Sequence, residues 1–242
     1  MNKMFIPFGM NCAPATGLRN LKLRDFALPF DWVRSTPESL AAVVEDDFKH
    51  FHEGLELSEC KKYVIDSYGI QFPHDYPTQK QAIPSDVSED ENVIEDILVD
   101  EWRESIPINK EKYARRIERF LSIMTSDEEL VLLTTCQLKD IQGFSHLFYR
   151  KYGKTNMMYV VLSDEVISEE EKQAYFHKGI CLCDPETVWV DENENWFIDP
   201  EEQNLLWKSA IVKLLTSKKI ELPAALHEES PCAPIASTSS LL

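Results

Sequence analysis

Cys12 is the first residue whose type and position could carry chemistry. It follows a short apolar run over residues 4–8 and a turn that contains Gly9 and Asn11, and residues 12–21 have the apolar spacing of a short helix. We therefore expect Cys12 at a helix N-terminus, where Asn11 can accept a free amide hydrogen of the first turn. The amides and the helix dipole there favour a nucleophilic thiolate, or instead bind an anion such as phosphate. The alternative is a small buried structural residue, because free cysteines are commonly buried.

A general base for this thiol could be His74, which lies in a segment rich in aromatic residues. Cysteine nucleophiles are commonly activated by a histidine whose ring is held in place by a carboxylate. Asp75 is a poor candidate for that third role, because adjacent side chains on an extended segment point to opposite faces. Asp66 or Asp31 would be better placed if the fold brings them near. The alternative for His74 is a hydrogen-bonded histidine of the core or its rim.

Two further groups of residues could bind a substrate. Asp31 and Trp32 stand together in a compact aromatic segment, where the carboxylate could orient the histidine, bind a substrate hydroxyl or cap a loop. Arg115 and Arg116 lie on a helix expected over residues 109–125 and could hold a phosphate or diphosphate through bidentate hydrogen bonds. The alternative for both arginines is ion pairing with the acidic stretch that precedes them.

The elements that must position these residues are predicted as alternating strands and helices. We expect strands at 4–8, 63–66, 130–135, 156–162, 180–182 and 187–190, and helices at 12–21, 36–49, 109–125, 140–152 and 200–216. Thr36 is the expected N-cap of the second helix and Pro37 its first-turn residue. His50 and His52 follow that helix and are expected on the surface. The alternation predicts an α/β fold with a mostly parallel sheet flanked by helices.

The domain organisation follows from length and local composition. A chain of 242 residues allows one large domain or two small ones. We expect a single α/β domain over residues 1–220, with an acidic insertion at about 78–106 that forms a solvated helix or a mobile segment. Residues 221–242 are rich in Pro, Ala and Ser, and we expect them to form a disordered tail.

Charge and cysteine usage limit the partners. The formal net charge is −17, from 42 acidic residues against 25 lysines and arginines, so we expect neither nucleic acid nor a membrane surface as a partner. No run approaches the ~20 apolar residues of a membrane helix, and the N-terminus is too short for a secretory signal. The expected location is therefore cytoplasmic. The six cysteines are scattered apart from Cys181 and Cys183, so we expect free thiols, no metal site and no cofactor.

Five motifs follow one another along the chain and point to a family. They are Gly9-Met10-Asn11-Cys12 continued by Leu18-Arg19, then Pro29-Phe30-Asp31-Trp32, Asp47-Phe48-Lys49-His50-Phe51, Phe72-Pro73-His74-Asp75, and Arg115-Arg116-Ile117-Glu118-Arg119-Phe120. Together they resemble a domain-of-unknown-function family labelled as "putative papain-like cysteine peptidases". The resemblance covers roughly residues 4–165, and it implies a catalytic cysteine at Cys12 with a histidine at His74.

The sequence departs from the family pattern at two places. Pro7-Phe8 replaces the usual Ser-Leu before Gly9, so a serine hydroxyl is missing near the turn. Cys136 stands where an arginine is expected, which weakens a phosphate-binding role for the preceding strand. The alternating elements of residues 109–216 also resemble a nucleotide-binding α/β fold more than the antiparallel barrel of papain.

The first functional hypothesis is a cysteine-dependent hydrolase or acyl-transfer enzyme that acts on a peptide or small molecule, glycan-related compounds included. Cys12 would be the nucleophile and His74 the base, with Asp31 or Asp66 as the orienting carboxylate. Backbone amides at Asn11 and Ala13 would stabilise the oxyanion. The candidate substrate-binding residues are Gly9, Asn11, Trp32, Asp75, Arg115 and Arg116.

Two alternatives stay open on the sequence alone. A glycosyltransferase-like or sugar-nucleotide-binding protein would use the turn from Gly9 to Cys12 and Arg115 or Arg116 to contact a diphosphate at the carboxyl ends of the strands. A non-catalytic interaction domain would leave Cys12 no more reactive than the other cysteines.

Overall fold

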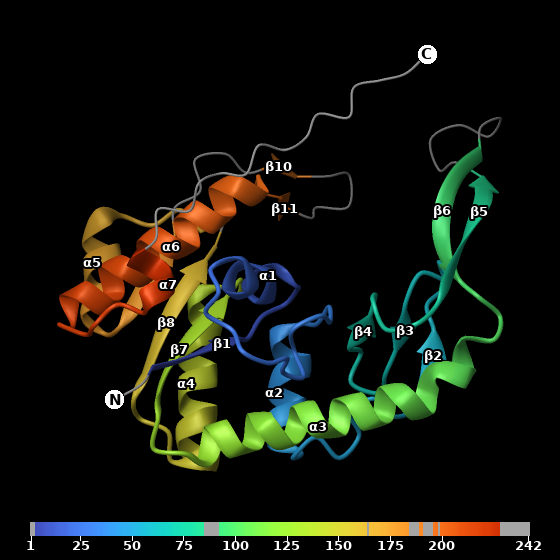
Figure 1. Ribbon diagram of the computed structural model, residues 1–242, viewed down its shortest axis with the longest axis horizontal. Coiled ribbons are helices and arrows are strands. Elements are labelled where there is room, and N and C mark those ends of the chain that lie inside the picture. Colours follow the sequence, from blue (N-terminus) through green and yellow to red (C-terminus); the bar gives the residue numbers. More distant parts are fainter. Residues whose placement is uncertain are drawn as a thin grey trace.

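The computed structural model describes residues 3–84, 92–163, 165–183, 189–190, 196–197 and 199–227. A parallel sheet with helices on both faces forms one end of the molecule, and small antiparallel strands form the other (Figure 1). The long helix α3 (Ile106–Thr125) runs along one side and connects the two ends. None of the helices in this part of the chain combines the length and the apolar character needed to span a bilayer.

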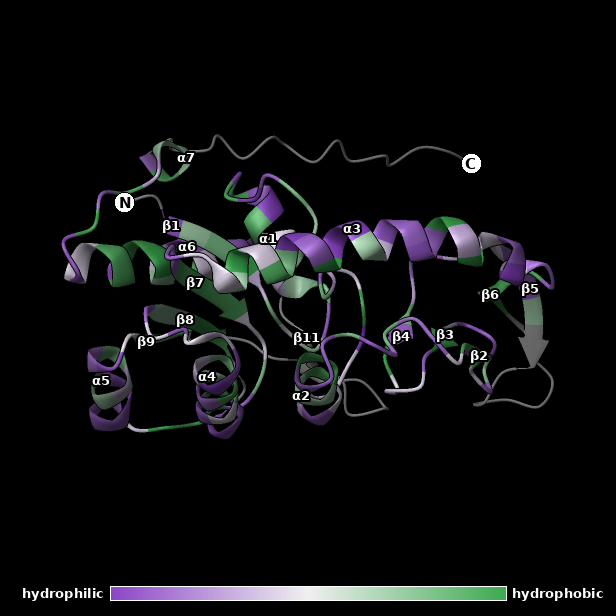
Figure 2. Cartoon of the chain, turned by 90° about the horizontal axis from the view of Figure 1, so that it is seen from below, coloured by the Kyte–Doolittle hydropathy of each residue, from purple (hydrophilic) through white to green (hydrophobic). Residues whose placement is uncertain are grey.

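The sheet has four parallel strands in the order β1-β7-β8-β9. These are β1 (Lys3–Pro7), β7 (Glu129–Thr134), β8 (Met157–Leu162) and β9 (Ile180–Cys183). Their central residues are apolar and buried because helices cover both faces, and Figure 2 shows the hydrophobic colour on β7 and β8 between the helices. The predicted α/β fold with a parallel sheet flanked by helices is confirmed.

One face of the sheet is covered by α1 (Ala13–Asn20) and α6 (Pro200–Ser217). Trp207 of α6 is fully buried there and lies against Gly17 of α1. A Cβ atom on Gly17 would come within 2.5 Å of the Trp207 ring, so this close approach of the two helices requires glycine.

The opposite face is covered by α2 (Pro37–Glu45), α4 (Leu138–Tyr152) and the C-terminal half of α3. Phe8 extends β1 into this layer, and its ring contacts those of Phe30, Phe144 and Phe148 edge-on at centroid distances of 4.9–5.2 Å. Edge-to-face packing of this kind adds to the free energy gained from burial. Helix α5 (Glu169–His177) lies beside β9.

Short antiparallel strands make up the rest of the fold. They are β2 (Glu56–Leu57), β3 (Val64–Ile65) and β4 (Gln71–Phe72), the hairpin of β5 (Thr78–Pro84) and β6 (Asn92–Leu98), and the pair β10 (Trp189–Val190) and β11 (Trp196–Phe197). The 3₁₀-helix η1 (Trp102–Ser105) leads into α3. Where it is described, the acidic stretch at 78–106 therefore forms mainly a β-hairpin rather than a solvated helix, because its two strands pair along their length.

Three further local predictions concern the start of α2, the end of α2 and the exposure of His52. Thr36 caps α2 as predicted, by accepting the amide of Ser39. The helix ends at Glu45 rather than near residue 49, because Asp47 and Phe48 adopt left-handed backbone conformations with φ of +54° and +61°. The prediction that His52 lies on the surface is wrong, since its side chain is 1 % exposed.

The start of the segment expected to form a disordered tail is ordered. Helix α7 (Ala224–His227) follows α6, and the Leu226 side chain is buried against the α1 and α6 layer. Residues 228–242 lie outside the described residues, so the predicted disorder of that part stays a prediction.

Candidate active site

The turn after β1 is built by close packing around Gly9. The amide of Phe8 continues the β1–β7 ladder by donating to the Leu133 carbonyl at 2.8 Å. A Cβ on Gly9 would lie 3.1 Å from Pro14 Cγ and 3.3 Å from the hydroxyl oxygen of Thr135. Gly9 therefore lets the chain pass tightly from the strand into α1 at the carboxyl edge of the sheet.

Cys12 is the N-cap residue of α1, but its side chain makes no capping hydrogen bond. Asn11 supplies that bond, because its Oδ1 accepts the amide of Ala13 at 3.0 Å. The Cys12 carbonyl accepts the Thr16 amide and so begins the helix. The thiol is half-buried, whereas Cys136, Cys181 and Cys183 are buried and Cys60 is exposed. Cys12 thus combines partial access with a helix N-terminus.

The backbone amides around Cys12 differ in one respect from the expected oxyanion site at Asn11 and Ala13. The Ala13 amide already donates to Asn11 and is not available. Within the described part of the chain, the amides of Asn11 and Cys12 donate to no protein acceptor. These two neighbouring donors can stabilise a negative oxygen beside the thiol.

Residues 33–35 lie between the Cys12 turn and the strand that leads to His74. On one edge, the Ser35 amide donates to the Met10 carbonyl at 3.0 Å. On the other edge, Arg34 and Gln71 exchange two backbone hydrogen bonds of 2.8 and 2.9 Å. The turn that holds Cys12 and the strand that leads to His74 are therefore both hydrogen-bonded to two neighbouring residues, Arg34 and Ser35.

Trp32, which comes directly before these residues, is half-buried. The exposed His74 ring stands edge-on to it, with ring centroids 6.3 Å apart and an interplanar angle of 86°. The guanidinium groups of Arg19 and Arg24 lie 5.1 and 5.3 Å from the Trp32 ring centroid. The structure thus brings Trp32 and His74 together, as parts of one surface that also includes α1.

Asp31 has a different environment from the one expected of an orienting carboxylate. It is fully buried, and its Oδ2 accepts the Leu28 amide at 2.9 Å and pairs with Arg24 at 2.8 Å. Burial raises the pKa of Asp31 to about 6, even though Arg24 and the Leu28 amide act in the opposite direction. Asp31 therefore closes the loop of residues 28–31, which is the loop-capping alternative.

Asp66 also organises a loop. Its carboxylate accepts the backbone amides of His52, Tyr68 and Ile70 at 2.9–3.0 Å. Burial raises its pKa to about 6, while the three amides act to lower it. Among the described residues, neither Asp31 nor Asp66 hydrogen-bonds to His74, so the structure does not bring the expected carboxylates to that ring.

Asp75 anchors the His74 turn to α3. Its two carboxylate oxygens contact the Lys112 ammonium group and the Tyr113 hydroxyl, and its carbonyl accepts the Asn109 side-chain amide at 2.7 Å. The Asp75 side chain is 5 % exposed and points into this cluster. Its contacts are those of an anchor for the preceding residue His74.

His52 belongs to a buried network that sequence reasoning missed. Its Nε2 lies 2.7 Å from the Tyr76 hydroxyl, and its ring packs against Phe72 and Tyr113. Burial lowers the pKa of His52 to about 4, with Asp75 acting in the opposite direction. The neutral, buried His52 side chain stabilises the His74 loop by contacting Phe72 and Tyr76, the residues on either side of that loop. The only signal for it in the sequence was its place within an aromatic stretch.

The two arginines of α3 differ from each other. Arg115 is exposed. Arg116 is half-buried, with its guanidinium 5.3 Å from the Tyr113 ring centroid and its Nη1 buried without an acceptor among the described residues. No contact of either arginine with the turn at residues 9–12 is found in the described chain.

The neighbouring helix N-terminus at α4 is already occupied by a carboxylate. Glu165, which follows β8, accepts the Leu138 amide at 2.8 Å. Cys136, beside it, is buried, and burial raises its pKa to about 11. The start of α1 is therefore the more open of these two helix starts at the carboxyl edge of the sheet. No group of three or more His, Cys, Asp or Glu side chains in the described residues could hold a metal ion.

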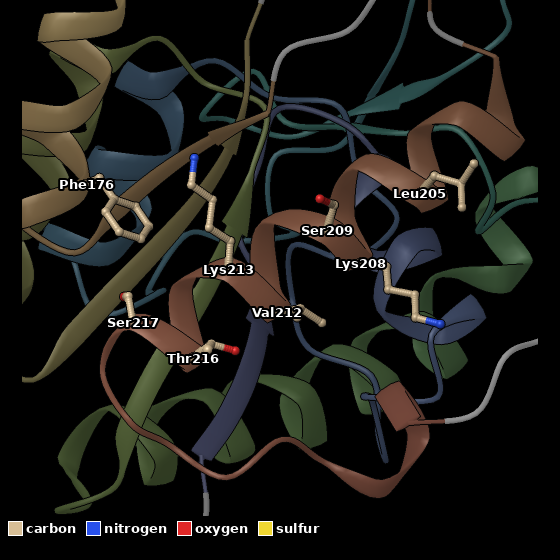
Figure 3. A pocket seen from close by; sticks show the side chains of 8 residues that line it. All are labelled: Phe176, Leu205, Lys208, Ser209, Val212, Lys213, Thr216 and Ser217. Carbon is tan, nitrogen blue, oxygen red and sulfur yellow. The ribbon is translucent and has the colours of Figure 1, made fainter.

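An open depression of about 730 Å³ lies elsewhere, on the outer face of α6 (Figure 3). Seven of its lining residues come from α6, and Phe176 of α5 faces Lys213 across it. None of the predicted site residues lines this depression.

The fold and the site together define an α/β protein with a half-buried cysteine at the first strand–helix turn of a parallel sheet. The family described as "Putative papain-like cysteine peptidase (DUF1796)" matches residues 3–157, and the chain belongs to this family. The resemblance inferred from the five motifs is confirmed.

The chain is also similar to a curated protein from a virus. It is "Uncharacterized protein R408" of Acanthamoeba polyphaga mimivirus, which is 30 % identical over 153 residues that cover 54 % of this chain. The chain spans 60 % of that protein's length. No solved structure matches the chain.

Proposed function

We propose that the protein is a cysteine-dependent hydrolase or acyl-transfer enzyme in which Cys12 is the nucleophile and His74 the base. The observation that carries this proposal is that the first turn of α1 is capped by a residue other than Cys12. Asn11 caps the helix, so the Cys12 thiol at the same helix end remains half-exposed and free to react. The family description supports the same class of chemistry.

The reaction would proceed through an acyl-enzyme. His74 accepts the proton of the Cys12 thiol, and the thiolate forms a bond to the substrate carbonyl carbon. The amides of Asn11 and Cys12 stabilise the resulting oxyanion. The leaving group then departs with the proton from His74. In hydrolysis, a water molecule gives a proton to His74 and attacks the thioester, which releases the acid and restores the thiol.

His74 would be positioned by its surroundings rather than by Asp31 or Asp66. Its ring stands against Trp32, and the next residue, Asp75, is tied to Lys112 and Tyr113 of α3. This anchoring fixes the backbone on one side of the ring and leaves the other side open to solvent. A peptide or a small acyl compound is the substrate class that this chemistry serves.

A direct test uses a small activated ester. The protein is incubated with p-nitrophenyl acetate, and the acetylated residue is identified by mass spectrometry of its peptides. Acetylation at Cys12 is expected in the parent protein, with loss in Cys12→Ser and strong slowing in His74→Ala. His50→Ala is the matched control, because His50 is an exposed histidine outside this surface. Acetylation of Cys60 alone would overturn the proposal.

A second candidate function has one observation in its favour. The Thr135 hydroxyl oxygen is buried without a partner among the described residues and faces the Gly9 turn, as a donor to a bound anion would. A sugar-nucleotide binder would place a phosphate there, beside the amides of Asn11 and Cys12. Thermal stabilisation by a nucleoside diphosphate sugar that is kept in Cys12→Ser and lost in Thr135→Val would favour this function over the first.

A further inference from the structure

Arg19 and Arg24 lie beside Trp32, and the charge of a third arginine, Arg116, acts on Arg24 and on the buried Asp31. The guanidinium groups of Arg19 and Arg24 both lie within 5.3 Å of the Trp32 ring centroid. Arg24 is committed to internal contacts, because it pairs with Asp31 and donates to the Phe26 carbonyl at 2.9 Å. Arg19 is exposed and reaches the solvent from the same ring.

The charges in this cluster do not balance. Asp31 is the carboxylate that pairs with Arg24, whereas Arg19 and Arg116 have no carboxylate partner among the described residues. The Nη1 of Arg116 is buried without an acceptor. The charges of Arg116 and Arg19 also act on Arg24, whose pKa is lowered mainly by burial. A local excess of positive charge in a chain of net charge −17 is a feature that an anionic ligand would complement.

The cluster stands on the Cys12 side of α1. Arg19 follows Cys12 by seven residues, which is close to two helical turns, so both lie on nearly the same face about 10 Å apart along the axis. Trp32 also contacts His74. A substrate that extends from His74 across Trp32 would therefore lie beside a guanidinium group stacked on an aromatic ring.

We infer that Arg19, held on Trp32, binds an anionic group of the substrate, a carboxylate or a phosphate, about two helical turns from the Cys12 thiol. The inference rests on the proposed function and names the substrate class of that site. Trp32 supplies an apolar surface for the part of the substrate between the anionic group and the reacting carbonyl. The charges of Arg24 and Arg116 add to the positive potential at this site.

The test compares an anionic and a neutral thiol reagent at the same cysteine. Iodoacetate and iodoacetamide both alkylate the thiolate, so the ratio of their rates cancels the thiolate fraction and reports the local potential. Peptide mass spectrometry gives this ratio separately for Cys12 and Cys60. We expect a higher ratio at Cys12, and a fall of about two-fold in Arg19→Gln at low ionic strength.

Arg103→Gln is the matched control. Arg103 is also an exposed arginine stacked on a tryptophan, with its guanidinium 4.4 Å from the Trp102 ring centroid, but it precedes α3 at the end of the molecule next to the antiparallel strands (Figure 1). Its substitution should leave the ratio at Cys12 unchanged. An equal fall in both variants, or no fall in Arg19→Gln, would overturn the inference.

A second measurement is independent of the thiol. Phenylglyoxal modifies exposed arginines, and inorganic phosphate or N-acetylglutamate should protect Arg19 but not Arg103 in the parent protein. Protection by one anion only identifies whether phosphate or carboxylate is the preferred group. If neither anion protects Arg19, the inference is overturned, whether or not Cys12 reacts with the thiol reagents. Slow iodoacetamide labelling of Cys12 together with protected Arg19 would instead contradict the proposed nucleophile and keep the anion site.

Discussion

The side-chain oxygen of Asn11 accepts the backbone amide of Ala13 at 3.0 Å, and it thereby caps α1 in place of the N-cap residue Cys12. This relationship explains how a cysteine can occupy a helix N-terminus without using its side chain to stabilise the helix. It also occupies the Ala13 amide, so the oxyanion site of the proposed enzyme would consist of the amides of Asn11 and Cys12.

Asn11→Ala should lower the free energy of unfolding by about 1 kcal/mol, because the cap of α1 is lost. Urea denaturation followed by circular dichroism measures the change. Asn11→Asp is the control, since its carboxylate can accept the same amide and suits the positive end of the helix dipole. Equal stability of Asn11→Ala and the parent protein would show that the cap contributes nothing.

The packing of α1 against α6 gives a second prediction. Gly17→Ala should destabilise the fold by about 1–3 kcal/mol, because the new methyl group would overlap the buried Trp207 ring. Gly143→Ala on α4 is the matched control. Nothing lies within 4 Å of a Cβ at Gly143, so alanine there should raise stability by up to about 1 kcal/mol through its helix propensity. Thermal unfolding of both variants tests the pair, and a neutral Gly17→Ala would contradict this packing.

His52 predicts a pH dependence of stability. Its pKa is about 4 in the folded protein against 6.5 for an unperturbed histidine, so the unfolded state binds a proton first as the pH falls. The contribution of His52 to stability is therefore complete above pH 6.5 and is lost between pH 6.5 and 4, by about 3 kcal/mol.

Two carboxylates act in the opposite direction over the same range. The pKa values of Asp31 and Asp66 are raised to about 6, so their ionisation costs stability as the pH rises from 4 to 6. His52→Gln removes only the histidine contribution, and its unfolding free energy should fall less than that of the parent between pH 7 and pH 4.5. His50→Gln, at an exposed position, should titrate like the parent. Parallel curves for His52→Gln and the parent would contradict the assigned pKa shift.

The Asp75 anchor predicts a linked loss of stability and reactivity. Asp75→Ala leaves the Tyr113 hydroxyl without its acceptor and removes the ion pair of Lys112, which keeps the Asn109 side-chain oxygen as an acceptor, and we expect a loss of about 2 kcal/mol. Tyr113→Phe removes a single contact and should cost about 1 kcal/mol. If this cluster positions His74, the rate of Cys12 acetylation should fall in both variants at temperatures where they remain folded. Unchanged rates in folded Asp75→Ala would show that the cluster is only structural.

Much of the fold could be predicted from the sequence because its signals are local. The buried strands β1, β7 and β8 are continuous apolar runs, and Thr36 with Pro37 marks the start of α2. The hairpin of β5 and β6 could not be predicted in this way. It is a two-stranded ribbon in which Ile97 and the adjacent Leu98 are both buried while Ile94 is 70 % exposed, so the burial of β6 does not follow the alternation that marks a strand in the sequence.

The position of Cys12 in the candidate site could be predicted from the sequence, whereas the contacts of the carboxylates and of His52 could not. Cys12 and Asn11 adjoin one strand and one helix, so their positions follow from local pattern. Asp31 pairs with Arg24, which precedes it by seven residues, and Asp66 accepts the amide of His52, which precedes it by 14 residues, besides two amides of its own loop. The burial of His52 likewise depends on Tyr76, which lies 24 residues away. No local pattern shows which carboxylate will find which partner.

The rate of Cys12 alkylation by iodoacetamide at near-neutral pH tests the central claim most directly. Cys232 is first replaced by Ser, and the labelled peptides are followed by mass spectrometry in the parent protein and in His74→Ala. An activated nucleophile predicts that Cys12 reacts about ten-fold faster than the exposed Cys60, and that His74→Ala removes most of this advantage. Labelling of Cys12 no faster than Cys60, unchanged by His74→Ala, would contradict the account.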